Sequence, residues 1–279
     1  MAITIKTQEQ IEKMRKAGKI LANLDKILAK EIKPGVSTKH LDKIAEDYIR
    51  SCGAVPSFKG YAGFPASICA SINEEVIHGI PGSRILKEGD IISIDMGSYI
   101  DGFHGDCART YPVGKISPEA QKLIDVTKQS FFEGIKFAKA GCHLNEIGAA
   151  IQKYVEDNGF SVVRDYVGHG IGKNLHEDPA VYNYKTTGRG PKLAKGMVLA
   201  IEPMVNMGTY KVDVLDDDWT VVTRDGLWAA HYENTVLITD GEPELLTLLW
   251  WKVVVISIWN LQQDRLCFLK AVMTRVVLL

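Results

Sequence analysis

The run LKEGDIISID at residues 86–95 has a counterpart later in the chain, LAKGMVLAIE at residues 193–202. The two runs align without a gap at an offset of 107 residues. In each run a glycine is followed by a largely apolar stretch that closes on an acid, Asp95 in the first and Glu202 in the second. A short apolar run of this kind predicts a buried strand, so both acids are expected at strand ends.

The repeat extends beyond these two runs. IHGI at residues 77–80 resembles GHGI at residues 168–171, which makes His78 the counterpart of His169. A period this long excludes a solenoid, whose repeats are about 20 to 50 residues long. We therefore predict two copies of one α/β unit about a pseudo-twofold axis, with the two closing acids at the centre. Three further positions match at nearly the same offset: Gly35, Tyr48 and Gly53 correspond to Gly141, Tyr154 and Gly159.

Composition sets the broad class of protein. The chain has 279 residues, 46% of them hydrophobic and 24% charged, which is typical of a globular protein with a sizeable core. The net charge of −1 gives no support for nucleic acid as the main ligand. The first residues lack the apolar core of a signal peptide, and the five cysteines show no paired metal-binding spacing. We therefore expect a cytoplasmic protein.

Local signals place some helix and turn boundaries. Thr7 and Gln10 form a capping-box pattern before a helical apolar repeat, and a second helix is expected after Pro34-Gly35. In the second half, Ser117-Pro118 predicts the start of another helix, which Gly141 is expected to end. Asp225-Gly226 predicts the turn of a β-hairpin just before Glu233.

Five candidate metal ligands occur in order along the chain, each at a predicted strand or strand end. One acid at a strand end is usually structural. Four carboxylates packed together without a cation would repel one another and lose hydration, so the set indicates two metal ions. It contains no thiolate, and Mn, Fe, Co and Zn all suit it. The five residues are Asp95, Asp106, His169, Glu202 and Glu233.

YVGHGIGKNLH at residues 166–176, followed by Asn183-Tyr184, resembles the signature of bacterial type I methionine aminopeptidases. The resemblance covers about residues 1–245. It implies an α+β pita-bread fold of the creatinase/aminopeptidase kind, with a mostly antiparallel central sheet. The expected organisation is a single metallopeptidase domain with an internal repeat, about 1–115 and 116–245. Residues 246–279 then form an atypical hydrophobic C-terminal tail.

The resemblance also implies roles for the five ligands. Asp95 and Glu233 would hold both metal ions, Asp106 one of them, and His169 with Glu202 the other. Two such ions, about 3.5 Å apart in two-metal hydrolases, activate a bridging water and polarise a carbonyl. Glu202 would also carry a proton from that water to the leaving amine.

Two further histidines match catalytic positions of the family. By resemblance, His176 contacts the substrate carbonyl and stabilises the oxyanion, and His78 reaches the scissile amide nitrogen. Both would therefore contact substrate. The remaining histidines match no such position and are interpreted as structural or surface residues: His40, His104, His143 and His231.

The resemblance places a methionine pocket beside the metal ligands. An aromatic and sulfur-lined slot suits an unbranched thioether. Phe58 stands where many relatives have cysteine, and Phe64 where tyrosine is common, so the size of the pocket stays open. Its expected wall consists of Phe58, Tyr61, Phe64, Cys69, Leu175 and Trp219.

The expected function is removal of N-terminal methionine from peptides and nascent proteins when the second residue is small, by a monomer with no specific nucleic-acid partner. Contact with the ribosome stays open. The apolar run at residues 245–261 contains Lys252 and falls short of the about 20 apolar residues that span a bilayer, which disfavours a membrane anchor. A proline-specific peptidase of the same fold is an alternative, but such enzymes resemble longer chains. A non-catalytic binding module is another, but it would be expected to lose ligands.

Overall fold

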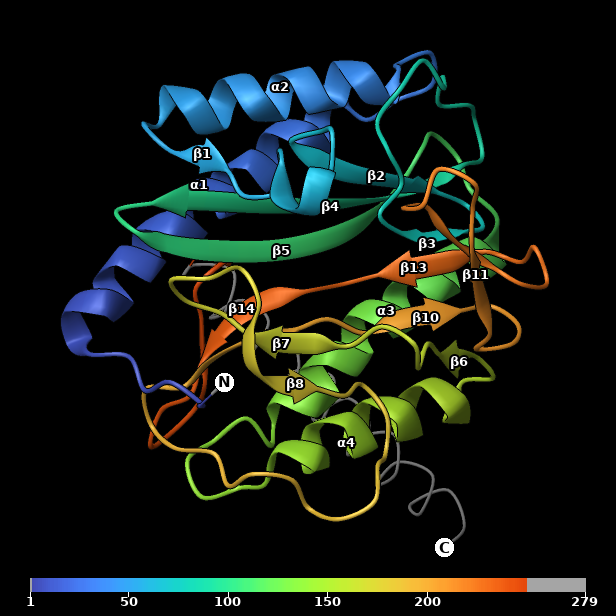
Figure 1. The fold of residues 1–279 in the computed structure, drawn as a ribbon. Helices are drawn as coiled ribbons and strands as arrows, with labels where there is room; N and C mark the ends of the chain where they lie inside the picture. Colours follow the sequence, from blue (N-terminus) through green and yellow to red (C-terminus); the bar gives the residue numbers. More distant parts are fainter. Residues whose placement is uncertain (1, 250–279) are drawn as a thin grey trace, which may run out of the picture. The chain divides into compact units, whose positions relative to one another are not determined.

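In the computed structural model, which describes residues 2–249, the chain begins with helices α1 (Gln8–Glu31) and α2 (Thr38–Ser51). The Thr7 hydroxyl accepts from the backbone N–H of Gln10, and the Gln10 side chain accepts from that of Thr7, so the predicted capping box is confirmed. Both helices lie on one side of the first sheet (Figure 1). Leucines and isoleucines on their inner faces form the core with that sheet.

The first sheet is antiparallel and centres on a long hairpin. Strand β4 (Ile91–Ile100) pairs with β5 (Phe103–Pro112) along its whole length. Asp101 and Gly102 join them with φ of 52° and 85°, as a tight hairpin turn requires. Strands β1 (Val55–Pro56) and β2 (Ile68–Ile72) flank β4 on its other edge. Between β1 and β2 lies the short 3-10 helix η1 (Tyr61–Gly63).

The second half repeats this plan. Helices α3 (Pro118–Ile135) and α4 (Leu144–Asp157) lie on the side of the molecule opposite to α1 and α2 (Figure 1). Its main sheet is antiparallel and has the order β15-β14-β9-β7-β8. The strands are β7 (Gly168–Gly170), β8 (Glu177–Val181), β9 (Val198–Ile201), β14 (Asn234–Leu237) and β15 (Glu244–Leu245).

Two small antiparallel sheets complete the described fold. One consists of β6 (Ser161–Val162), β10 (Met204–Asn206) and β13 (Ala229–His231). The other consists of β3 (Glu75–Ile77), β11 (Val212–Val214) and β12 (Val221–Thr223).

The two halves meet where β5 lies beside the start of β14. The Thr235 hydroxyl donates to the carbonyl of Asp106 at 2.8 Å and accepts from the N–H of the same residue at 2.9 Å. The N–H of Glu233 donates to the carbonyl of Ala108 at 3.0 Å. These bonds join segments more than 120 residues apart and bring Asp106 and Glu233 to the same seam.

Paired glycines adopt matching conformations in the two halves. Gly89 and Gly196, which precede the two matching strands, have φ of 94° and 88°. Gly35 and Gly141 have φ of 89° and 97°. Only glycine adopts this left-handed conformation at little cost, so equivalent backbone turns explain the matching residues. The strands agree as well, since β2-β4-β5 in the first half corresponds to β7-β9-β14 in the second.

The predicted pairing of His78 with His169 is wrong. His169 lies within β7, and the strand that corresponds to β7 in the first half is β2. His78 instead follows β3, which pairs with β12 in a separate sheet. The short IHGI and GHGI runs are therefore similar in sequence without occupying equivalent places.

Two local boundaries also differ from expectation. Helix α3 ends at Ile135 and not at Gly141, because Lys139 already forms a β-bridge with Thr239 and the N–H of Ala140 donates to the carbonyl of Thr239. Gly226 does form a turn, with φ of 71°, but the expected hairpin is wrong. β12 pairs with β11 and β3, whereas β13 pairs with β10, so the turn connects two sheets.

The compact unit ends at Thr247, two residues beyond the expected boundary. Leu246 is 5% exposed, and no Cβ would fit on Gly18 of α1 because the carbonyl oxygen of Leu246 lies there. The Thr247 hydroxyl accepts from the N–H of Thr235 at 3.2 Å and donates to the Asn234 side chain at 2.9 Å. Residues 246 and 247 thus belong to the domain, whereas residues 250–279 of the expected tail lie outside the described part of the chain.

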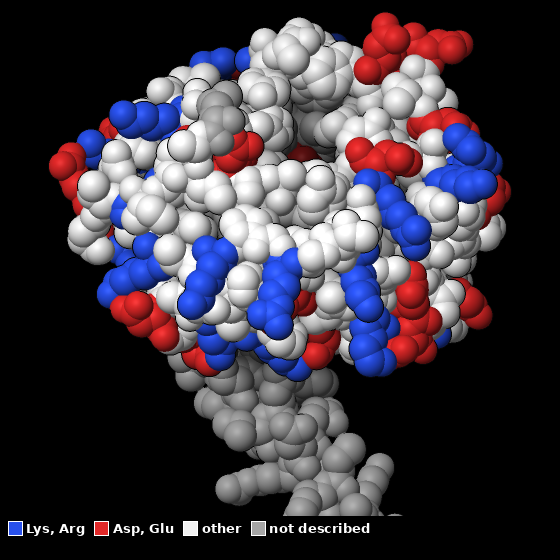
Figure 2. All heavy atoms as spheres, turned by 60° about the horizontal axis from the view of Figure 1, so that its bottom comes forward, with Lys and Arg blue, Asp and Glu red and all other residues white. Residues whose placement is uncertain are grey.

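Two surface properties follow from the described residues. None of the helices between residues 2 and 249 has both the length and the apolar composition needed to cross a membrane. On the face shown in Figure 2, Lys and Arg side chains lie next to Asp and Glu side chains, in keeping with the small net charge.

Candidate active site

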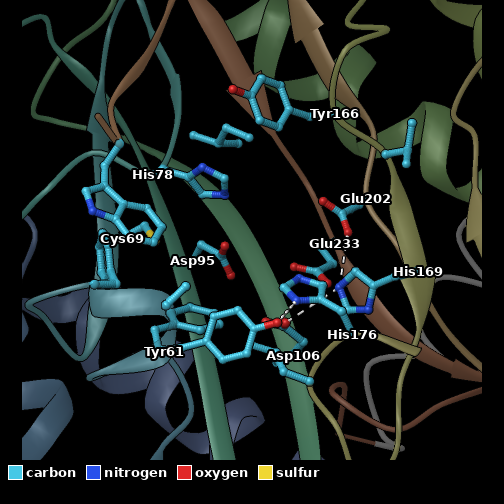
Figure 3. Close-up of a pocket in the computed structure, with 17 residues that line it drawn as sticks. Tyr61, Cys69, His78, Asp95, Asp106, Tyr166, His169, His176, Glu202 and Glu233 are labelled. Carbon is cyan, nitrogen blue, oxygen red and sulfur yellow. Dashed lines mark hydrogen bonds and ion pairs between the residues drawn. The ribbon is translucent and has the colours of Figure 1, made fainter. Parts of the chain in front are cut away.

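One pocket is lined by every residue that the sequence placed at the site (Figure 3). Residues of both halves of the chain line this pocket. Tyr166 also lines the pocket, although the sequence analysis assigned it no role. Its place as the first residue of the signature run at residues 166–176 could have indicated this position. The other lining residues that were not expected are Ala62, Ile77 and Val167.

The candidate metal ligands converge because each lies on a strand or at a strand end near the seam. Asp106, His169 and Glu233 each present one ligand atom, and these atoms all lie within 4.8 Å of one another. His169 Nε2 lies 3.5 Å from Glu202 Oε1 and 4.0 Å from Asp106 Oδ2. Asp95, on β4, faces the same cluster (Figure 3).

The buried carboxylates lack partners within the described chain. Asp95 Oδ1, Asp106 Oδ1 and Glu233 Oε1 are buried and accept no hydrogen bond from residues 2–249. Arg109 is buried nearby, but its guanidinium donates to the carbonyls of Ala108 and Glu233 and to the Asn234 side chain. A buried oxygen without a partner costs free energy, so the donor set fits divalent cations, which prefer such oxygens.

Burial also changes the protonation of these acids. It raises the pKa of Asp95 to about 7. Burial, and then repulsion from neighbouring carboxylates, raises the pKa of Asp106 and of Glu233 well above its usual range. Burial and the nearby Asp95 do the same to the pKa of Glu202. A bound cation opposes these shifts because it stabilises the ionised form.

His169 is arranged as a neutral ligand. Its Nδ1 lies 2.9 Å from the carbonyl oxygen of Gly170, which can only accept, so Nδ1 carries the proton. Burial lowers the pKa of His169 to about 3, which keeps the ring neutral. The free lone pair is therefore on Nε2, the nitrogen that faces Glu202 and Asp106.

The loop that carries His176 is tied to the N-terminal segment. Glu177, the next residue, accepts from Lys6 Nζ at 2.6 Å and from the Thr4 hydroxyl at 2.8 Å. The side chains of Lys6 and Glu177 are 5% and 7% exposed, so this ion pair is shielded from water. The His176 ring packs edge-on against His169, with centroids 4.3 Å apart. His176 is therefore held beside the ligand cluster.

His78 enters the pocket from a constrained backbone. It has φ of 59°, and a Cβ on the next residue, Gly79, would lie 2.5 Å from the carbonyl oxygen of Ala70. Its ring meets those of Tyr166 and Trp219 edge-on at 5.7 and 6.2 Å. A left-handed non-glycine residue is strained, and such strain is concentrated at functional sites.

The wall opposite the ligands is apolar. Phe58, Phe64, Cys69 and Leu175 are all buried. Phe64 and Trp219 meet edge-to-face with centroids 5.0 Å apart. Burial, and then the nearby carboxylates, raises the pKa of Cys69 well above its usual range, so the thiol is neutral. The pocket thus joins an apolar slot to a buried acidic cluster.

His231 lies closer to the site than the sequence interpretation suggested. It is 2% exposed, and its Nε2 lies 3.8 Å from Glu202 Oε2. It precedes Glu233 by two residues, and residues two apart in an extended segment point the same way. That spacing was the signal that could have identified it.

The chain is similar in sequence to known proteins. The sequence model of metallopeptidase family M24 matches residues 12–240. A methionine aminopeptidase of Clostridium acetobutylicum is 62% identical over 247 residues, which cover 88% of this chain and 99% of the relative. Methionine aminopeptidase 1 of Bacillus subtilis is 56% identical over 245 residues, covering 88% of this chain and 99% of that protein.

Solved structures agree in fold. The crystal structure of a methionine aminopeptidase from Thermotoga maritima superposes with a TM-score of 0.87 at 45% identity, covering 89% of this chain and 100% of the other. The prolidase from Pyrococcus furiosus superposes with a TM-score of 0.72 at 24% identity, covering 88% of this chain and 65% of the prolidase.

Proposed function

Because this chain belongs to metallopeptidase family M24, we propose that it hydrolyses peptides as a methionine aminopeptidase and removes the N-terminal methionine when the second residue is small. The observation that carries this proposal is the pocket itself, in which an apolar, aromatic wall with a neutral thiol faces four carboxylates, those of Asp106 and Glu233 buried, and a neutral histidine. The wall suits a thioether side chain, and the acids suit the metal ions of a hydrolase.

The cluster of buried ligands supports divalent metal binding. We propose two ions, drawn from Mn, Fe, Co and Zn, because several carboxylate oxygens accept no hydrogen bond from residues 2–249. Asp95 and Glu233 would hold both ions, Asp106 one of them, and His169 with Glu202 the other. When bound, such ions supply Lewis-acid activation of water and of a carbonyl group.

The chain's own residues would complete the reaction. Glu202 would accept a proton at its carboxylate and pass it to the leaving amine, since it is buried beside the ligand cluster. His176 would donate a hydrogen bond to the substrate carbonyl oxygen as negative charge develops there. His78 would contact the nitrogen of the cleaved amide. The apolar wall, which includes Phe58, Phe64 and Trp219, would hold the methionine side chain and exclude water.

A comparison of two peptides tests the function. We expect methionine to be released from Met-Ala-Ser but not from Met-Leu-Ser, because the resemblance to methionine aminopeptidases implies a cramped site for the second residue. Free methionine would be measured with Mn, Fe, Co and Zn supplied in turn, with a chelator as the control. Equal cleavage of both peptides, or of neither with every metal, would overturn the proposal.

We further propose a monomer that acts on nascent chains in the cytoplasm. All the candidate ligands come from one chain, so no second copy is needed to complete the site. Within residues 2–249 the cysteines Cys52, Cys69, Cys107 and Cys142 are free thiols, as a reducing compartment permits.

We also propose that the catalytic domain ends at Thr247. A chain ending at Leu249 should keep full turnover and metal content. A chain ending at Pro243 should lose stability by about 2 to 5 kcal/mol, because it loses β15 and the buried Leu246. Urea unfolding monitored by circular dichroism would measure the stability of both truncated chains. Thr247→Val, made in the full chain, would measure what the Thr247 hydroxyl alone contributes to stability. Equal stability of the two truncated chains would place the domain boundary before β15.

A further inference from the structure

Tyr61 makes a short hydrogen bond to His176. Its hydroxyl oxygen lies 2.6 Å from His176 Nδ1 (Figure 3). Tyr61 is 42% exposed, so unlike Phe58 and Phe64 it is not held in place by burial. Because this hydrogen bond orients an exposed side chain, we expect the Tyr61 hydroxyl to have a function of its own, besides the contact that the ring makes in the pocket wall.

The loop that presents Tyr61 has an unusual backbone. Gly60, Ala62 and Gly63 all have positive φ, of 85°, 47° and 91°. The alanine is the costly one, since the Cβ of a left-handed residue crowds the following carbonyl oxygen. The loop is closed by its own bonds, among them Gly60 N–H to the Phe64 carbonyl at 2.8 Å. This tight loop projects Tyr61 toward His176.

The bond constrains the proton of His176. A neutral imidazole carries one proton, on Nδ1 or on Nε2. If the Tyr61 hydroxyl donates to Nδ1, that proton must be on Nε2, the nitrogen left to meet a substrate. The opposite tautomer would present a lone pair to a carbonyl oxygen and repel it. The ring nitrogens are therefore not equivalent in this setting.

We propose that Tyr61 is a positioning residue that holds His176 in its Nε2–H tautomer, ready to donate to the substrate carbonyl oxygen. This inference rests on the proposed function, in which His176 stabilises the oxyanion. The position of Tyr61 in the pocket wall does not by itself require such a bond. Phe58 and Phe64 share the same loop and have no hydroxyl.

Tyr61→Phe removes the hydroxyl and keeps the ring. We expect kcat to fall about tenfold to a hundredfold, the usual range for losing a group that orients a functional histidine, with KM and metal content unchanged. Tyr182→Phe is the matched control, because Tyr182 is also exposed (36%) but is absent from the pocket lining. A change confined to KM would show that Tyr61 serves only as pocket wall.

The tautomer can be observed without turnover. In the zinc-loaded protein, which is diamagnetic, ¹⁵N shifts at one pH should show His176 protonated at Nε2, and a tautomer mixture in Tyr61→Phe. Protonation at Nδ1 in the wild type, or an unchanged tautomer in the variant, would overturn the inference. Failure of the wild type to cleave Met-Ala-Ser would instead overturn the proposed function, which the shifts do not test.

Discussion

We expect replacement of His169 or Glu202 by alanine to abolish turnover and to leave the fold intact. Each removes a side chain at the centre of the ligand cluster, where His169 Nε2 and Glu202 Oε1 lie 3.5 Å apart. Loss of a partner that only orients a ligand typically costs about 10 to 100-fold. We therefore expect loss of a ligand itself to exceed that range, with metal content reduced.

The fold should survive because the cluster is not a source of stability in the metal-free protein. Burial and the nearby Asp95 raise the pKa of Glu202, so its ionised form is disfavoured there. Glu202→Gln, which keeps shape and removes charge, should then leave the metal-free protein at least as stable as the wild type. Metal analysis, peptide assay and urea unfolding would be made on each variant, with His40→Ala as an exposed-histidine control. Full activity in His169→Ala would exclude it as a ligand.

Replacing His176 by alanine has a different expected signature. The residue lies against His169 but outside the set of three whose ligand atoms gather within 4.8 Å. We expect metal content to be kept while kcat falls by about two to three orders of magnitude, the scale of losing one oxyanion donor.

This loss should appear mainly in kcat, because charge on the carbonyl oxygen develops only in the transition state. Steady-state kinetics on Met-Ala-Ser, together with metal analysis, would distinguish His176→Ala from the variants of the metal ligands His169 and Glu202. Near wild-type turnover in His176→Ala with metal retained would remove His176 from the mechanism. Loss of metal in that variant would reassign it to the ligand set.

The sequence alone was sufficient where interactions are local. Thr7 and Gln10 are three residues apart, and their reciprocal bonds need nothing from the rest of the chain. Ser117 starts α3 for the same reason. The glycines of the repeat were informative because a left-handed turn restricts the residue type directly. Residue chemistry alone likewise selected the candidate ligands, since four acids and a histidine in predicted strands have few uses other than metal. Their expected place at strand ends holds for Glu202 and Glu233 but is wrong for Asp95, which lies inside β4.

Only the tertiary structure showed how these parts meet. The turn at Gly226 is local, but the partners of β12 and β13 are distant strands, so the predicted hairpin failed. The side chains of His231 and Glu202 lie close together only because β10 and β13 pair. Tyr61 and His176 are 115 residues apart, and the sequence around neither residue predicts the hydrogen bond between them. Local patterns determine backbone conformation within a few residues, whereas contacts across a hundred residues depend on which packing of whole sheets and helices buries the most apolar surface.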